Sequence, residues 1–221
     1  MDRMRSVLIL VLAMGTVVMA QSRHPVTGRV IAPVMSVEGH RWLDRSEREA
    51  EEEPTKAIEA LAIRPGMVVA DVGAGSGYYT MRLAVKVGPS GRVFATDVQR
   101  GMLDLIERRV AAASVRHVTT ILGSAEDPGL PAGALDLILM VDVYHELESP
   151  QTFMRRLRTA LKPDGRLVLL EFRKEDPKVP IRQEHKMTVD EVRRELTADG
   201  YVFDRVIGGL PWQHILVFTV K

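Results

Sequence analysis

The stretch that decides the fold is Asp71-Val72-Gly73-Ala74-Gly75-Ser76-Gly77, which lies between a predicted strand and a predicted helix. Residues 67–72 form a short apolar run, and apolar residues recur at helical spacing from Thr80 to Val87. Glycines between a strand and a helix permit positive φ angles and let a ligand approach the backbone closely. The stretch therefore predicts a strand–loop–helix unit with a ligand site at the loop.

The spacing of this loop differs from that of dinucleotide-binding folds, which have G-x-G-x-x-G with the pyrophosphate at the helix N-terminus. Tyr78 stands where the third glycine of that motif would fall. The carboxylate of Asp71 is a poor neighbour for a pyrophosphate, but it suits a ligand that carries an ammonium and a sulfonium group. A nicotinamide-dependent oxidoreductase is therefore a disfavoured alternative.

Strands and helices alternate along the rest of the chain. The nearly continuous apolar run 135–141 is typical of a central parallel strand that is covered on both faces. Two strands near the end, 201–207 and 215–220, have no helix between them, which indicates an antiparallel pair at the sheet edge. Further strands are expected at 92–96, 118–122 and 166–171. The pattern predicts one α/β domain.

The first 20 residues are typical of a secretory signal rather than of the fold. Arg3 and Arg5 precede an apolar run that begins at Val7, and small residues end the segment before Gln21. We therefore expect an exported protein, either periplasmic or secreted. The alternative is an uncleaved N-terminal anchor, which would be the only expected contact with a membrane.

Residues 21–44 show no periodicity and are expected to form an extended arm or linker, with the domain at 45–221. Ser46 and Glu49 have the spacing of a capping box, which predicts a helix that begins at Ser46. Thr188 and Glu191 have the same spacing ahead of another predicted helix. Trp42 is expected in a lid over the ligand, and the glutamates that follow are expected to be solvated.

Composition excludes several classes of site and partner. The chain has no cysteine, so disulfides, thiolate metal sites and a cysteine nucleophile are excluded. The formal net charge is +1 with no long basic run, so we expect no nucleic-acid partner. A small molecule is the expected partner, and the oligomeric state is left open.

Acidic residues follow two more predicted strands. Asp97 ends the strand after the glycine loop, where a carboxylate can accept hydrogen bonds from both ribose hydroxyls. The run 123–127 (GSAED) follows the next strand, where an adenine ring would lie across the carboxyl ends of the sheet. Either feature alone is typical of a solvated loop, but their order at successive strand ends indicates a nucleoside site.

With these positions in place, the sequence resembles the class I S-adenosylmethionine-dependent methyltransferases with a D-x-G-x-G-x-G loop, over roughly residues 55–221. The resemblance implies an α/β fold with helices on both faces of a seven-stranded, mostly parallel sheet. Its strand order would be 3-2-1-4-5-7-6, with strand seven antiparallel. This order agrees with the terminal strand pair that the pattern itself predicts.

The resemblance also implies S-adenosylmethionine as the cofactor. Asp71, Gly73 and Gly75 would surround the methionine moiety, Asp97 would bind the ribose, and the run from Ser124 to Glu126 would meet the adenine edge. The full predicted set of cofactor-binding residues is Asp71, Gly73, Ala74, Gly75, Gly77, Asp97, Val98, Met102, Ser124, Ala125, Glu126 and Asp142.

We expect the part of the site where the methyl acceptor reacts to lie after the fourth and fifth strands, because substrates of open α/β sheets bind beyond the carboxyl ends of the strands. The predicted catalytic residues are His145, Tyr144 and Glu171. His145 is suited to accept a proton from a methyl acceptor at neutral pH. The alternative, that His145 only packs or caps the following helix, stays open. No metal site is predicted.

Two functions therefore compete. The first is a methyltransferase that acts on a small-molecule acceptor by in-line methyl transfer, which needs positioning more than acid–base chemistry. The second is an exported protein that binds S-adenosylmethionine or S-adenosylhomocysteine without transferase activity. Conversion of the cofactor in the presence of an acceptor distinguishes them.

Overall fold

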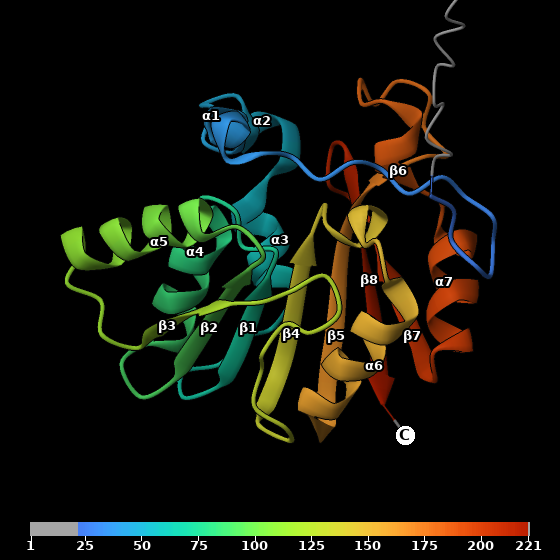
Figure 1. Cartoon of the computed structure of the whole chain (residues 1–221). Helices are drawn as coiled ribbons and strands as arrows, with labels where there is room; N and C mark the ends of the chain where they lie inside the picture. Colours follow the sequence, from blue (N-terminus) through green and yellow to red (C-terminus); the bar gives the residue numbers. More distant parts are fainter. Residues whose placement is uncertain (1–21, 221) are drawn as a thin grey trace, which may run out of the picture.

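One mixed β-sheet organises the chain, and the computed structural model describes residues 22–220 of it (Figure 1). The strand order is β3-β2-β1-β4-β5-β8-β7, with β8 antiparallel to both of its neighbours and the five strands from β3 to β5 parallel. The strands are β1 (Val68–Val72), β2 (Arg92–Asp97), β3 (Val118–Leu122), β4 (Leu135–Val141), β5 (Leu161–Arg173), β7 (Tyr201–Ile207) and β8 (Gln213–Val220). The predicted fold class and strand order are confirmed, with β8 and β7 as the predicted strands seven and six.

Alternate residues of the central strand β4 enter two different cores. Ile138 and Met140 pack with the helices α6 (Pro150–Ala160) and α7 (Val189–Ala198). Leu137 and Leu139 pack with α3 (Pro54–Ala60) and α4 (Tyr78–Val87), and α5 (Arg100–Ala112) contacts β2 and β3. Since successive side chains of a strand point to opposite faces, a strand that is covered on both sides must be largely apolar. In 135–141 the one polar residue is Asp136, whose carboxylate accepts hydrogen bonds from the Val68 amide and from Lys162.

The two predicted capping boxes have opposite outcomes. Thr188 caps α7 as predicted, with the Glu191 amide donating to Thr188 Oγ1 at 3.0 Å and Glu191 accepting from the Thr188 amide at 2.9 Å. The prediction for Ser46 is wrong, because α2 (Arg48–Glu52) follows Glu47 and has no side-chain cap. Buried ion pairs from arginines to Glu52 stabilise this segment instead.

The fifth strand is longer than predicted. β5 runs from Leu161 to Arg173, beyond the predicted 166–171, and the two-residue strand β6 (Lys186–Met187) pairs with its end. β6 was not predicted, because two residues carry no periodicity. The predicted leader, residues 1–20, lies outside the described residues. Within 22–220 we find no helix long and apolar enough to span a bilayer.

Residues 22–36 form an extended arm, but they are docked on the domain rather than acting as a free linker. In Figure 1 the arm is the blue segment that crosses the top of the molecule between α1 (His40–Leu43) and α7. An isolated bridge between Arg23 and Val30 closes it on itself. Ile31 and Ala32 are buried with the core, which explains why the arm stays on the domain.

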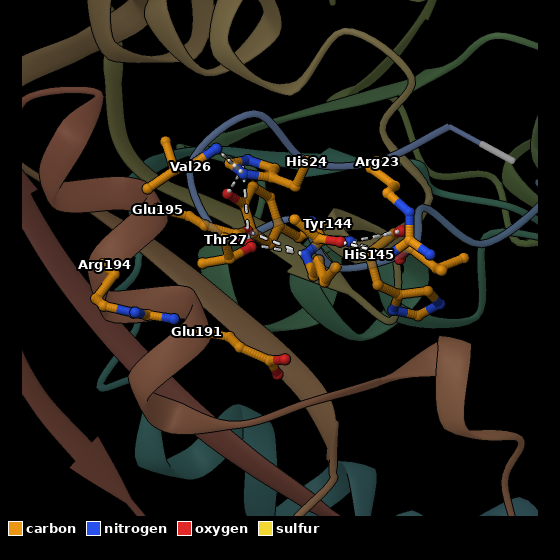
Figure 2. Close-up of polar contacts among 12 residues, drawn as sticks. Arg23, His24, Val26, Thr27, Tyr144, His145, Glu191, Arg194 and Glu195 are labelled. Atoms are coloured by element: carbon orange, nitrogen blue, oxygen red, sulfur yellow. Dashed lines mark hydrogen bonds and ion pairs between the residues drawn. The ribbon is translucent and has the colours of Figure 1, made fainter.

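Glu195 of α7 is the anchor of this arm (Figure 2). Its side chain is fully buried and accepts hydrogen bonds from Thr27 and from Arg29 Nε at 3.0 and 3.1 Å. His24 Nδ1 lies 3.4 Å from the same carboxylate. Arg29 also donates to the backbone carbonyl of His145 at 3.1 Å, so the anchor connects the arm to a predicted catalytic residue.

We expect Glu195→Ala to lower the free energy of unfolding by about 3–5 kcal/mol, because it leaves the buried Arg29 guanidinium without its carboxylate. The measurement is urea denaturation followed by circular dichroism. Asp190→Ala is the matched control on the same helix, since its ion pairs with Arg193 and Arg194 are exposed. That control should change stability by less than about 0.5 kcal/mol, and equal effects of the two changes would contradict the anchor.

Candidate cofactor and acceptor site

A cavity of about 760 Å³ lies at the carboxyl ends of the parallel strands. This is the place where open α/β sheets bind ligands. The loops after β1, β2, β3 and β4 form its floor, and α1 and the end of the arm contribute Trp42, Leu43 and residues 34–36 to its lining. The cavity thus joins the predicted cofactor loop and the predicted reacting end.

The glycine loop has the backbone geometry that its sequence predicts. Gly73 and Gly75 both line the cavity and have φ angles of +68° and +52°. A Cβ on Gly73 would lie 2.6 Å from a methyl carbon of Val143, and one on Gly75 would lie 2.7 Å from Cδ1 of Leu43. The backbone conformation therefore favours glycine at both positions, and at Gly73 the close approach of Val143 adds a limit on space.

Asp97 stands at the end of β2 and holds the glycine loop. Its Oδ2 accepts the amide hydrogen of Gly75 at 3.0 Å, and its Oδ1 accepts that of Gln99 at 2.9 Å. The side chain lines the cavity, and burial raises its pKa. A carboxylate offers about four lone-pair sites, so two backbone bonds leave acceptor capacity for hydroxyl groups of a ligand.

The structure brings together most of the predicted cofactor-binding residues, but four do not line the cavity. Asp71 lies beneath the loop, where it accepts a hydrogen bond from Thr80 Oγ1 at 2.6 Å, and burial raises its pKa to about 6. Gly77 begins α4, and a Cβ there would meet Ile106. The residues that line the cavity are Gly73, Gly75, Asp97, Val98, Met102, Ser124, Ala125 and Asp142, and those that do not are Asp71, Ala74, Gly77 and Glu126.

Asp142 directly follows β4. Its backbone is strained, and only one of its two carboxylate oxygens accepts a hydrogen bond from the described residues. Its φ is +55°, in a region that favours glycine. Gln213 Nε2 donates to Oδ2 at 2.6 Å, whereas Oδ1 is buried and has no hydrogen-bond partner within residues 22–220. Burial, together with the charges of Glu52 and Glu171, raises its pKa well above the usual range. A buried acceptor of this kind at the cavity favours a cationic or hydrogen-donating ligand.

His145 and Glu171 form a buried pair at the other end of the cavity. His145 Nδ1 lies 2.6 Å from Glu171 Oε2, and Glu171 Oε1 accepts the amide hydrogen of Tyr144 at 3.0 Å. His145 lines the cavity, while Glu171 is fully buried behind it. A carboxylate in this position fixes the orientation of the imidazole.

Tyr144 lies away from the cavity lining, in the core that contains α6 and α7. Its hydroxyl lies 3.4 Å from His24 Nε2 of the arm, as Figure 2 shows. The 3-10 helix η2 (Tyr144–Glu146) turns successive side chains in different directions, so His145 can line the cavity while Tyr144 packs against the arm. The catalytic roles predicted for these residues stay predictions.

Two further cavity residues are absent from the predicted catalytic and cofactor-binding sets. Glu146 of η2 and His185 of the 3-10 helix η3 (Gln183–His185) lie beside His145. Burial raises the pKa of Glu146 to about 7, and burial together with His145 lowers that of His185 to about 4. No local spacing signals this group, because 40 residues separate the two histidines.

The segment in which a lid was expected, from Trp42 to Glu52, contains more buried charge than predicted. Trp42 lines the cavity as predicted for a lid, and the Arg45 guanidinium lies 3.7 Å from the centre of its ring. Glu52 is buried rather than solvated, and it pairs with Arg45 at 3.1 Å and with Arg48 at 2.7 Å. Both arginines and Glu52 line the cavity, which makes this wall polar.

Comparison with known proteins shows what this domain is similar to. Residues 70–169 match a family described as a methyltransferase domain. The chain is 35% identical over 112 residues to a demethylmenaquinone methyltransferase of Symbiobacterium thermophilum, a match that covers 50% of this chain and 45% of that protein. It is 31% identical over 118 residues to the ubiquinone/menaquinone biosynthesis C-methyltransferase UbiE of Ectopseudomonas mendocina, covering 53% and 46%. The chain thus spans about half the length of these curated relatives.

Solved structures match over more of the chain. The crystal structure of an S-adenosylmethionine-dependent methyltransferase from Aquifex aeolicus superimposes with a TM-score of 0.80 and 26% identity, covering 85% of this chain and 100% of that one. A type 11 methyltransferase from Sulfolobus solfataricus, at 19% identity and a TM-score of 0.65, shares the fold. Together with the methyltransferase domain, these matches support S-adenosylmethionine as the cofactor.

We expect Gly75→Val to abolish S-adenosylmethionine binding, because a branched side chain would be strained at φ +52° and would project toward Leu43. Isothermal titration calorimetry measures the affinity. Gly88→Val is the matched control, since Gly88 also has a positive φ but a Cβ there meets nothing within 4 Å. Circular dichroism must show both variants folded, and unchanged affinity in Gly75→Val would place the cofactor elsewhere.

We expect Asp97→Ala to weaken S-adenosylmethionine binding by about 1–3 kcal/mol, or roughly 5- to 150-fold in Kd, the usual effect of losing hydrogen bonds to a charged acceptor. Asp104→Ala on α5 removes an exposed carboxylate that pairs with Arg100, and should leave the affinity unchanged. The same calorimetric titration tests both. A loss confined to the Asp104 variant would contradict the assignment.

Proposed function

We propose that this class I S-adenosylmethionine-dependent methyltransferase transfers a methyl group to a small, largely apolar acceptor of the quinol or phenol type. The observation that carries the proposal is the continuity of one cavity, which is lined by the glycine loop and Asp97 at one end and by His145 at the other. The activities for which relatives at about 30% identity are named, demethylmenaquinone and ubiquinone/menaquinone methyl transfer, support this class of acceptor.

At the cofactor end of the cavity, backbone groups and carboxylates would bind S-adenosylmethionine. Bound S-adenosylmethionine supplies a methyl group activated on a sulfonium. Gly73 and Gly75 let its methionine part approach the loop, and Asp97 accepts the ribose hydroxyls with its remaining lone pairs. Asp142 Oδ1, the buried oxygen without a partner in the described chain, is placed to accept the ammonium group.

The acceptor end would use the His145–Glu171 pair as a general base. His145 would take the proton of an acceptor hydroxyl or of an activated ring carbon, and Glu171 would stabilise the resulting imidazolium. The acceptor then forms a bond to the methyl carbon while the carbon–sulfur bond breaks and leaves a neutral thioether. Phe153 and Phe172 line this part of the cavity and suit an aromatic acceptor.

Export is a separate part of the proposal, and the predicted leader at residues 1–20 supports it. An exported chain would have to obtain a cofactor that is made in the cytosol. A cofactor-binding protein without transferase activity therefore stays the second candidate, and turnover decides between the two.

The test is to incubate the purified chain with S-adenosylmethionine and a panel of reduced naphthoquinols, benzoquinols and phenols, and to measure S-adenosylhomocysteine by chromatography. We expect acceptor-dependent conversion with at least one quinol and none with the Gly75→Val variant. Cofactor binding without conversion across the whole panel would overturn the transferase and support the binding protein.

A further inference from the structure

Three side chains at the acceptor end point their ligand atoms at one another. His145 Nε2 lies 3.1 Å from His185 Nδ1. Glu146 Oε1 lies 3.9 Å from the first of these nitrogens and 3.8 Å from the second. All three residues line the cavity, so the group opens onto the space that would hold the acceptor.

We propose that His145, His185 and Glu146 bind a divalent transition-metal cation, and that Zn²⁺ is the ion that fits them best. Two imidazoles and one carboxylate are a donor set of catalytic zinc sites, which keep a fourth position open. Bonds of about 2.0–2.1 Å in tetrahedral geometry place donor atoms about 3.3–3.4 Å apart. The observed separations of 3.1–3.9 Å therefore need shifts of only a few tenths of an ångström.

The surroundings of His145 already have the form of a metal site. Its other nitrogen, Nδ1, lies 2.6 Å from the buried Glu171 carboxylate, and metal-ligating histidines usually donate this second N–H to such a partner. The backbone carbonyl of His145 accepts from Arg29 and from the Ala32 amide at 3.0 Å. Tautomer, ring and backbone are thus fixed before any ion arrives.

His185 is free to take the tautomer that a metal requires. In the metal-free chain its Nδ1 shares a hydrogen bond with His145, and Arg182 lies 3.5 Å from its Nε2. That second distance is at the limit of a hydrogen bond, and the Arg182 side chain is 75% exposed. Loss of this weak contact lets Nε2 carry the proton and leaves the Nδ1 lone pair for the ion.

The open position faces the cavity, where an anionic oxygen of the acceptor would be the fourth ligand. This use of the site rests on the proposed acceptor class but replaces the base role of His145, because an ion on Nε2 leaves that nitrogen no lone pair for a proton. The cation would instead favour the phenolate or quinolate anion that attacks the methyl group, and the acceptor's proton would go to solvent. The binding of the ion itself rests only on the three side chains and can be tested without turnover.

The experiment uses the full chain without an affinity tag, freed of metal with a chelator and titrated with Zn²⁺ in a calorimeter. A parallel titration with Co²⁺ is read from the visible absorption bands of the tetrahedral ion. We expect one ion per chain, at least tenfold weaker binding in His185→Ala and Glu146→Gln, and 10- to 100-fold weaker binding in Glu171→Gln. Absence of cysteine removes thiolate binding as a background.

Two matched controls accompany these variants. Glu148→Gln changes another glutamate that lines the cavity but is not part of the three-residue group, and His117→Ala changes a histidine that bonds to the Ala84 carbonyl. Both should bind Zn²⁺ as the unmodified chain does. No Zn²⁺ binding by the unmodified chain, or equal affinity in His185→Ala, would overturn the site.

Titration of the same samples with S-adenosylmethionine separates this proposal from the proposed function. A chain that binds the cofactor but not Zn²⁺ overturns only the metal site. A chain that binds Zn²⁺ but neither binds nor converts the cofactor overturns only the transferase. Cofactor binding by His185→Ala also shows that the variant is folded.

Discussion

The hydrogen bond between Glu171 and the imidazole of His145 is the interaction on which the rest of the site depends. Glu171 is at the end of β5 and is fully buried, so its charge must be satisfied by the chain itself. It is satisfied by the Tyr144 amide and the His145 ring, which fixes the turn after β4 against β5. The arm then docks on the outer side of that turn through the His145 carbonyl. Glu171 therefore holds the residue whose carbonyl the arm contacts, while Glu195 is the buried carboxylate that anchors the arm itself.

Charge is also buried in the lid. Glu52 with Arg45 and Arg48 forms a network over the cavity, and Arg48 contributes to the electrostatic environment of Asp142. Burial of ion pairs is costly, so such a network adds less to stability than its number of contacts suggests. Its effect is to place polar groups near the half-satisfied Asp142 carboxylate, where an apolar lid would leave the ligand's charged groups without partners.

The sheet could be predicted because the sequence patterns that indicate its strands and helices are local and recur along the chain. The apolar run 135–141 and the capping box at Thr188 each depend on neighbours within a few residues, and both are confirmed. The prediction of a Ser46 cap is wrong, and the segment contains instead the ion pairs of Glu52 with Arg45 and Arg48, which the capping pattern does not report. The cavity wall formed by Glu146 and His185 depends on contacts across the fold, and no local pattern contains them. Asp71 illustrates a third case, in which the motif was recognised but its side chain bonds to Thr80 beneath the loop.

The docking of the arm has a consequence for how the site is assembled. Arg29 and Glu195 are 166 residues apart, so their contact closes one of the longest loops in the chain. Loop closure over such a separation is slow compared with local pairing, and the N-terminal part of a chain is synthesised first. The arm must therefore wait, without its anchor, until α7 has been made and packed. Residues 34–36, which line the cavity, reach their final places only then. The ligand cavity is consequently a late product of folding, completed after the sheet that supports it.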